Sequence, residues 1–290
     1  GMTVVVVGAL VRDYYEGREA AQMFALIGII MMAVPLVAPM LGAELQKLGG
    51  WRAIFVFLLA YAVLLLGLMA GFLPKPAKTE KIGRGIFAVV AGRFKRVLQT
   101  RAAMGYLFFQ AFSFSSMFVF LTESSFVYMK LYGVSPRLYA WMFGLNIITM
   151  ATFNRITAWR LKTGTHPQAI LKWGIIVQLG ANLLMAVSAA AFDLPPFWLL
   201  VGCVMFSVGT QGLVSANTQA CFMGYFKEEG GSANAVLGVC QSVIGASVGM
   251  LTTWLHNGTA QIMPFMMLAS TVCGIILLRS CSHQAWKENS

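Results

Sequence analysis

One carboxylate in this sequence lies at a position where it would fall inside a membrane-spanning helix. Glu123 directly follows an uncharged stretch, and it shares a helical face with two aromatic and two hydroxyl side chains. At about 100° per residue the five positions cover roughly 80° of arc. Ionisable groups inside a bilayer cost a few kcal/mol or more, and they usually face a cavity where they pair, bind cations or carry protons. The other members of this face are Phe109, Ser113, Ser116 and Phe120.

Such a face predicts a binding site or a proton site. A lipophilic cation would stack on the aromatic rings, and the carboxylate of Glu123 would neutralise its charge. The sequence supports an alternative equally well, in which Glu123 lies at the wet outer mouth of its helix and is simply hydrated.

A second polar stripe follows one face of the apolar stretch at residues 197–226. Lipid would not tolerate these side chains, so they should face a cavity or another helix. Asn146, Met150 and Thr157 either extend the same wall or form hydrogen bonds between helices. The stripe consists of Ser207, Gln211, Asn217 and Thr218.

The sequence gives little support to other kinds of chemistry. It has no GxxxxGK[ST] loop for ATP and no GxSxG or HExxH motif, so we do not expect an enzyme. The three histidines are far apart, and the five cysteines read as free thiols, most of them inside predicted spans. We therefore expect no metal site and no cofactor.

Composition identifies the elements that position these residues as membrane helices. Hydrophobic residues make up 58% of the 290 residues and charged residues 11%, whereas a soluble domain is about 25% charged. About 20 apolar residues in a helix cross roughly 30 Å of hydrocarbon. We predict eight spans, with a turn at Asn257-Gly258 between the last two: residues 20–43, 53–74, 102–122, 138–154, 173–192, 197–226, 232–255 and 260–278.

The first 11 residues are apolar but too few to cross a membrane. They predict the tail of a further helix, since a signal peptide would need a basic start and a small-residue cleavage site. The fold class is thus an all-α membrane protein of about 8.5 transmembrane helices.

The net charge of +11 indicates orientation, and no nucleic-acid partner is expected. Of the 21 Lys and Arg residues, 17 lie on one set of alternate connections, which should face the cytoplasm together with the C-terminus. The longest of these connections, residues 74–101, divides the chain. It contains either an amphipathic helix on the anionic inner leaflet or a solvated linker.

Several motifs carry a resemblance to a known family. Arg12-Asp13 opens a polar loop, Ala38-Pro39-Met40-Leu41-Gly42-Ala43 lies in the next span, and Gly50-Trp51-Arg52-Ala53-Ile54-Phe55 opens the span after it. These segments resemble the RD loop, the antiporter motif GPxxGG and the GWRxIF sequence of the bicyclomycin-resistance (Bcr/CflA) drug:proton antiporters of the major facilitator superfamily. Alanines stand here at two of the family's glycine positions, 38 and 43.

Segments of the second half resemble the same family: Phe126-Val127-Tyr128, Asn154-Arg155 and Gly231-Ser232-Ala233-Asn234-Ala235. The resemblance assigns residues 1–73 to part of helix 4 and to helices 5 and 6 of twelve. Residues 74–101 then form the cytoplasmic central loop, 102–280 the C-terminal six-helix half, and 281–290 a cytoplasmic tail. The chain would thus be an N-terminally truncated major facilitator fold fragment containing helices 4 to 12.

The resemblance implies a secondary active transporter in the bacterial inner membrane that is monomeric when complete. It would couple protons to the efflux of drugs or other small lipophilic or cationic compounds, and this truncated chain could lack activity. Gating or interface roles are expected for Arg12, Asp13, Pro39, Gly42, Asn154, Arg155 and the close-packing pair Gly245 and Gly249. The alternative is a non-transporting membrane remnant or an interaction partner of another transporter chain.

Overall fold

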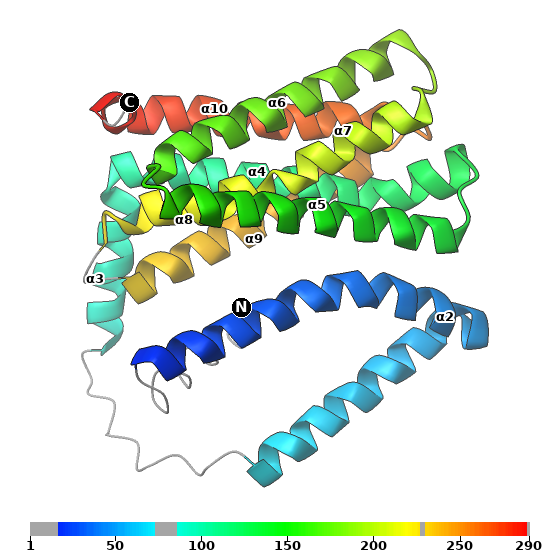
Figure 1. Ribbon diagram of the computed structural model, residues 1–290, viewed down its shortest axis with the longest axis horizontal. Coiled ribbons are helices and arrows are strands. Elements are labelled where there is room, and N and C mark those ends of the chain that lie inside the picture. The colour runs from blue at the N-terminus through cyan, green and yellow to red at the C-terminus, as the bar shows by residue number, and fades with distance from the viewer. Residues whose placement is uncertain (1–16, 73–85, 227–229, 289–290) are drawn as a thin grey trace.

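The computed structural model describes residues 17–72, 86–226 and 230–288, and this part of the chain is helical without a strand (Figure 1). After α2 come a short helix, α3, and a bundle of long helices. Their bounds are α2 Gly17–Phe72, α3 Ile86–Gln99, α4 Arg101–Ser125, α5 Pro136–Lys162, α6 Pro167–Ala191, α7 Phe197–Gly209, α8 Gln211–Met223, α9 Gly230–Leu255 and α10 Ile262–Glu288. A π-helical turn, Phe126–Leu131, continues α4.

Helix α2 consists of two arms joined at a sharp bend, visible as a V below the bundle in Figure 1. The bend lies at Gly49 and at Gly50, whose φ of 66° falls in the left-handed region that glycine adopts without a steric penalty. Two consecutive non-helical residues thus separate the two arms, which correspond to the predicted spans 20–43 and 53–74.

Six described segments are long and apolar enough to cross a membrane, compared with the eight that we predicted. They are Met40–Gly71, Arg101–Leu131, Pro167–Ala191, Phe197–Met223, Gly230–Leu255 and Ile262–Ser282. The difference has two sources. The first arm of α2 is described only in part, and α5, although 27 residues long, carries asparagine and threonine along its length.

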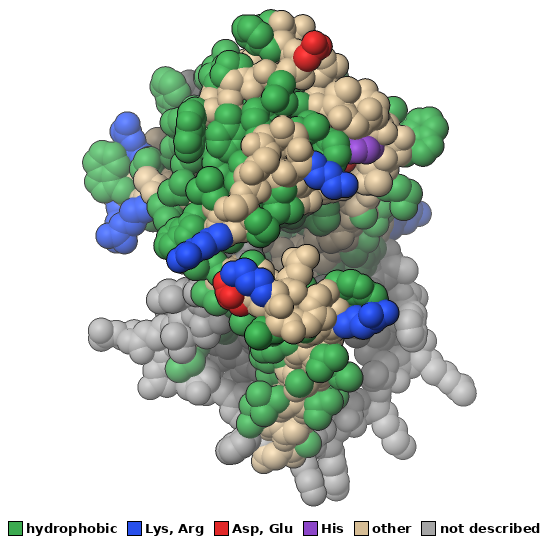
Figure 2. All heavy atoms as spheres, turned by 90° about the vertical axis from the view of Figure 1, so that its right-hand side faces the viewer, with side chains coloured by type: hydrophobic (Ala, Val, Ile, Leu, Met, Phe, Trp, Pro, Cys, Tyr) green, Lys and Arg blue, Asp and Glu red, His purple; other side chains and the backbone are tan. Residues whose placement is uncertain are grey.

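Helix α4 is the centre of the bundle, where it contacts α10, α9 and α8. Helix α6 packs against α7, α8 and α10, whereas α5 packs against α7 and α8 and provides the contact with α2. The outside is apolar. Figure 2 looks onto the end of the molecule where α2 bends, and hydrophobic side chains dominate the described surface there while charged ones are scattered. Large apolar side chains are also exposed along the helices, among them Trp141, Trp173, Trp198 and Trp254, as expected for a helix bundle in lipid.

Helix α3 lies within the 74–101 connector, for which we expected either an amphipathic helix on the inner leaflet or a solvated linker. It packs against α9 and α4, with Val97 fully buried and Phe94 packed against the same apolar cluster. Arg93 and Lys95 remain exposed. Among the described side chains of this helix, Val97 and Phe94 therefore pack against the protein, whereas Leu98 is 55% exposed.

At Gly212 the backbones of α8 and α5 approach each other closely. A side chain here would begin 2.6 Å from the backbone nitrogen of Asn154 and would also overlap the carbonyl oxygen of Met150. The backbone oxygen of Gly212 accepts a 2.9 Å hydrogen bond from the buried hydroxyl of Thr157. Glycine at this position therefore sets the distance between the two helices.

Replacing Gly212 by alanine should separate α8 from α5, because the atoms in the way are backbone and cannot rotate aside. We expect a loss of about 1–3 kcal/mol, as is typical of overpacked sites, measured as a lower midpoint of thermal unfolding in detergent. The control is Gly180→Ala in α6, where no atom lies within 4 Å of the added carbon. Equal midpoints for the two variants would contradict this account.

Candidate functional site

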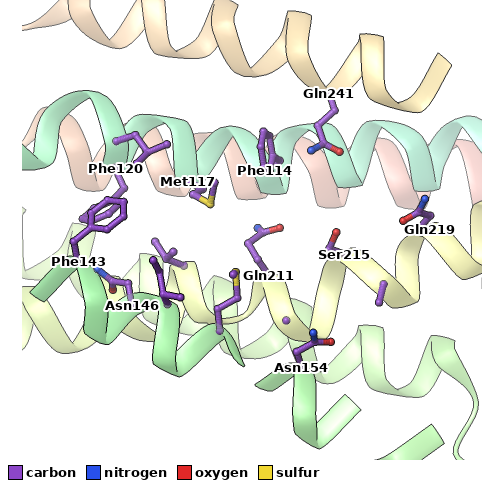
Figure 3. Close-up of a pocket in the computed structure, with 16 residues that line it drawn as sticks. Phe114, Met117, Phe120, Phe143, Asn146, Asn154, Gln211, Ser215, Gln219 and Gln241 are labelled. Carbon is purple, nitrogen blue, oxygen red and sulfur yellow. The ribbon is translucent and has the colours of Figure 1, made fainter. Parts of the chain in front are cut away.

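A cavity of about 580 Å³ lies between α4, α5, α8 and α9, with one residue of α7 at its wall (Figure 3). None of its lining side chains carries a formal charge. The lining consists of Phe114, Met117, Phe120, Leu121, Phe143, Asn146, Ile147, Met150, Asn154, Val208, Gln211, Gly212, Ser215, Ala216, Gln219 and Gln241. The volume is within the range of small-molecule sites, roughly 300–1,000 Å³.

Aromatic rings and amides share the wall of this cavity. The rings of Phe120 and Phe143 stack with their centroids 5.9 Å apart, and Phe114 lies further along the same side of α4 (Figure 3). Five amide side chains come from α5, α8 and α9: Asn146, Asn154, Gln211, Gln219 and Gln241. The combination suits a flat apolar molecule that also forms a few hydrogen bonds.

The amide oxygens of two of these side chains have no hydrogen-bond partner among the described residues. The amide nitrogen of Gln211 donates to the backbone oxygen of Ser113 at 2.9 Å, and that of Asn146 donates to the backbone oxygen of Met142 at 3.2 Å. Backbone carbonyls only accept, so each amide is fixed with its nitrogen toward the carbonyl. Oε1 of Gln211 and Oδ1 of Asn146 are buried and have no partner among the described residues.

Other polar side chains join the helices of the bundle to one another. The hydroxyl of Ser113 donates to Oε1 of Gln178 on α6 at 2.9 Å and accepts from Gln211 on α8 at 2.8 Å. The amide of Asn182 on α6 donates to the hydroxyl of Thr271 on α10 at 2.8 Å and to Ser116 at 3.4 Å. Ser113 and Ser116 thus face the neighbouring helices of the bundle.

Glu123 lies one helical turn beyond Phe120 and points away from the cavity. Its Oε2 is 2.9 Å from Nδ1 of His256, which follows α9. The carboxyl side chain is 5% exposed, so Glu123 is not the hydrated surface group of our alternative reading. Neither is it among the residues that line the cavity.

Comparison with known proteins identifies the architecture. Residues 1–250 match the family model described as Major Facilitator Superfamily. This chain belongs to the Major Facilitator Superfamily. It is therefore a multi-pass membrane protein of a transporter family, as the sequence motifs predicted, and not of an enzyme family.

Three relatives show where in the superfamily the chain falls. A bicyclomycin resistance protein homolog of Haemophilus influenzae is 30% identical to it over 94% of this chain and 68% of the relative. An uncharacterized MFS-type transporter, YdgK of Bacillus subtilis, is 27% identical over 99% and 71%. The multidrug resistance protein MdtL of Shigella flexneri is 25% identical over 96% and 68%. These matches confirm the Bcr/CflA resemblance, and the chain spans about two thirds of the length of these relatives.

The structure brings only some of the predicted pathway residues of this superfamily member to the cavity. Phe120 and Gln211 line it, as does Asn154, for which we expected a gating role. Phe109 packs against Gly274 of α10. Ser207, Asn217 and Thr218 are buried between helices, where Asn217 donates to the backbone oxygen of Leu213 at 2.6 Å.

The remaining gating and interface residues are spread over the fold. Arg12 and Asp13 lie outside the described residues. Pro39 and Gly42 belong to the first arm of α2, and Gly42 has no atom within 4 Å of the place where a side chain would begin. Arg155 is exposed on α5.

The glycine pair of α9 packs against α4. A side chain at Gly245 would begin 3.2 Å from the ring of Phe118, and one at Gly249 would begin 3.4 Å from the hydroxyl of Thr122. The small face that the two glycines form therefore has α4, the central helix of the bundle, as its partner.

The α4–α9 contact generates a stability prediction for a matched pair of variants. Gly245→Leu should displace the ring of Phe118 and lower the free energy of unfolding by about 1–3 kcal/mol, as overpacking does. Gly238→Leu, on the exposed side of the same helix with nothing within 4 Å, should be close to neutral. Thermal unfolding in detergent would compare the two, and a neutral Gly245→Leu variant would refute the contact.

Sequence reasoning missed several residues of the site. Phe114, Phe143, Gln219 and Gln241 line the cavity. They lie among ordinary apolar and polar positions, and nothing in their spacing separates them from lipid-facing or packing residues. His256 was assigned to a turn without a role, because its contact with Glu123 joins positions 133 residues apart.

Proposed function

We propose that this chain belongs to a secondary transporter that exports small lipophilic compounds, with the cavity between α4, α5, α8 and α9 as the substrate site. The observation that carries the proposal is the make-up of this wall: stacked phenylalanines and, among the described residues, two buried amide oxygens without partners and no charged lining side chain. Such a wall favours uncharged aromatic molecules that carry hydrogen-bond donors.

The names of the relatives agree with this substrate class. Among the similar proteins are a bicyclomycin resistance protein homolog, multidrug resistance proteins and a chloramphenicol resistance protein of Pseudomonas aeruginosa. Chloramphenicol is an uncharged aromatic compound with hydroxyl and amide donors, so it is the natural first ligand to test. A lipophilic cation would find no counter-charge at this wall.

The energy for export would come from the proton gradient. The sequence has no ATP-binding loop, and one charge moved across 100 mV contributes about 2.3 kcal/mol. We place the C-terminus and the residue 74–101 connector in the cytoplasm, following the distribution of Lys and Arg. Export then moves compounds toward the end of the bundle where α2 bends.

The lining residues of the cavity all belong to the second half of the chain, and none of the described residues of α2 contributes. Binding therefore depends on one half alone, whereas transport requires the opposing wall as well. We accordingly separate the two in the experiments. A chain that binds but does not transport would favour the alternative function, in which it completes its path with another transporter chain.

Binding should depend on the free amide oxygen at residue 146. Asn146→Leu keeps the size of the side chain and removes the acceptor, so we expect about a five- to tenfold weaker affinity for chloramphenicol, corresponding to one lost hydrogen bond. Binding of radiolabelled compound to the detergent-purified protein measures this loss.

Two controls belong to that measurement. Thr152→Val changes an exposed position of the same helix and should leave the affinity unaltered. Diacetylated chloramphenicol lacks the hydroxyl donors. Its affinities for the wild-type protein and for Asn146→Leu should therefore differ less than those of chloramphenicol. Equal loss for both compounds would count against an acceptor role of Asn146.

Export itself is tested in inverted membrane vesicles with an acidic lumen. Radiolabelled chloramphenicol should accumulate in the lumen, and a protonophore that collapses the gradient should abolish the accumulation. Accumulation that survives the protonophore would exclude proton coupling. Failure of the purified protein to bind any uncharged aromatic drug would refute the proposed substrate site.

A further inference from the structure

The pair formed by Glu123 and His256 has no part in the cavity. It lies at the end of the bundle where α2 bends, the end seen in Figure 2, and it connects α4 with the residue that follows α9. Its two members differ in access to the outside. The imidazole side chain is 31% exposed, whereas the carboxyl group behind it is 5% exposed. A proton from the surroundings therefore meets His256 before it meets Glu123.

In the described part of the chain, His256 is the one side chain that forms a hydrogen bond or an ion pair with this carboxylate. The titratable and charged groups on the surrounding elements are Tyr128, Lys130, Tyr132, Arg137, Tyr139 and Asp193. None of them forms a hydrogen bond or an ion pair with Glu123 among the described contacts. The hydroxyl of Tyr139 is 2.9 Å from that of Ser124, Tyr132 donates to the backbone oxygen of Pro195, and the ammonium of Lys130 lies over the ring of Phe126.

The imidazole is held in place by more than the carboxylate. The ring of Phe126 meets that of His256 edge to face, with centroids 4.4 Å apart. The two helices that carry the pair are packed tightly through Gly245 and Gly249. This arrangement fixes Nδ1 toward Glu123 and leaves the other ring nitrogen as the one that can reach the outside.

We propose that Glu123 and His256 form a proton-binding site, in which His256 conducts the proton and Glu123 stores it. Imidazole readily gains and loses protons near neutral pH. A proton from outside adds to Nε2 of His256, and the proton on Nδ1 then moves to Oε2 of Glu123. The products are a neutral carboxylic acid and a neutral imidazole in its other tautomer, so one proton is bound in total.

Proton storage would alter the connection between the two helices. The hydrogen bond between an ionised carboxylate and imidazole is charge-assisted, and it weakens when Glu123 becomes neutral. Because Phe120 of the cavity lies one turn before Glu123 on α4, the same helix carries both sites. The role of this site in export rests on the function proposed above, whereas proton binding by the pair does not.

Infrared titration tests proton binding without transport. Between about pH 4 and pH 9, which covers the usual range of carboxyl and imidazole groups, the reconstituted wild-type protein should show the carbonyl stretch of a buried protonated carboxyl group. Glu123→Gln should lack this band. His256→Asn, which keeps a donor but cannot relay a proton, should change the midpoint of this band.

The control for this titration is Asp193→Asn, which removes an exposed carboxylate at the same end of the bundle and should leave the buried band intact. The proposal is overturned if Glu123→Gln retains every carboxyl band of the wild-type protein. An unshifted midpoint in His256→Asn would also overturn it, because the two groups would then not act as a pair.

Transport by the same variants separates this inference from the proposed function. Glu123→Gln should lose at least about tenfold of proton-driven chloramphenicol accumulation, since one coupled charge is removed. It should keep exchange of labelled for unlabelled drug across a membrane without a gradient. Full proton-driven accumulation in Glu123→Gln would refute coupling through this site. Absence of exchange in the wild-type protein would instead refute the proposed function. In that case the infrared titration would remain the test of proton binding by the pair.

Discussion

A lipid interior supplies no hydrogen-bond partner, and this constraint governs the arrangement of the bundle. Every polar side chain on these helices must find its partner in the protein or remain unpaired at a cost. Ser113, Gln178 and Gln211 form hydrogen bonds with one another across three helices, and Asn182 forms one with Thr271 of α10. The polar residues therefore determine which faces of the helices turn inward, and the apolar residues fill the space between them.

The same constraint gives meaning to the polar atoms that are left over. The amide nitrogens of Gln211 and Asn146 each donate to a backbone carbonyl. Their amide oxygens are buried and have no partner among the described residues. In a fully packed interior such an oxygen would be a defect. Beside a cavity it is a fixed acceptor, positioned before any ligand arrives, and its orientation cannot reverse without loss of the backbone contact.

The span positions could be predicted from the sequence because lipid imposes a simple requirement, a stretch of about 20 residues without charge. Helix α5 is not apolar enough to count as a membrane span, because polar residues interrupt its sequence. It packs against α7 and α8 in the bundle. Helical spacing placed Phe109, Ser113, Ser116, Phe120 and Glu123 on one face of the helix, but of these only Phe120 lines the cavity. It could not give the rotation of α4 relative to its neighbours, so the cavity-facing residues Phe114, Met117 and Leu121 were missed. The contact between Glu123 and His256 depends on the folded chain, and no local pattern contains it.

The tight bend of α2 has a consequence for how the protein enters its membrane. Two non-helical residues, Gly49 and Gly50, separate the arms, and three charged residues, Glu44, Lys47 and Arg52, flank the bend. Such a short link leaves no room for one arm to integrate while the other waits in water, so the arms enter the bilayer together as a helical hairpin. In the structure Glu44 and Lys47 at the tip form an ion pair at 2.8 Å, so the three charges beside the bend sum to a single net positive charge.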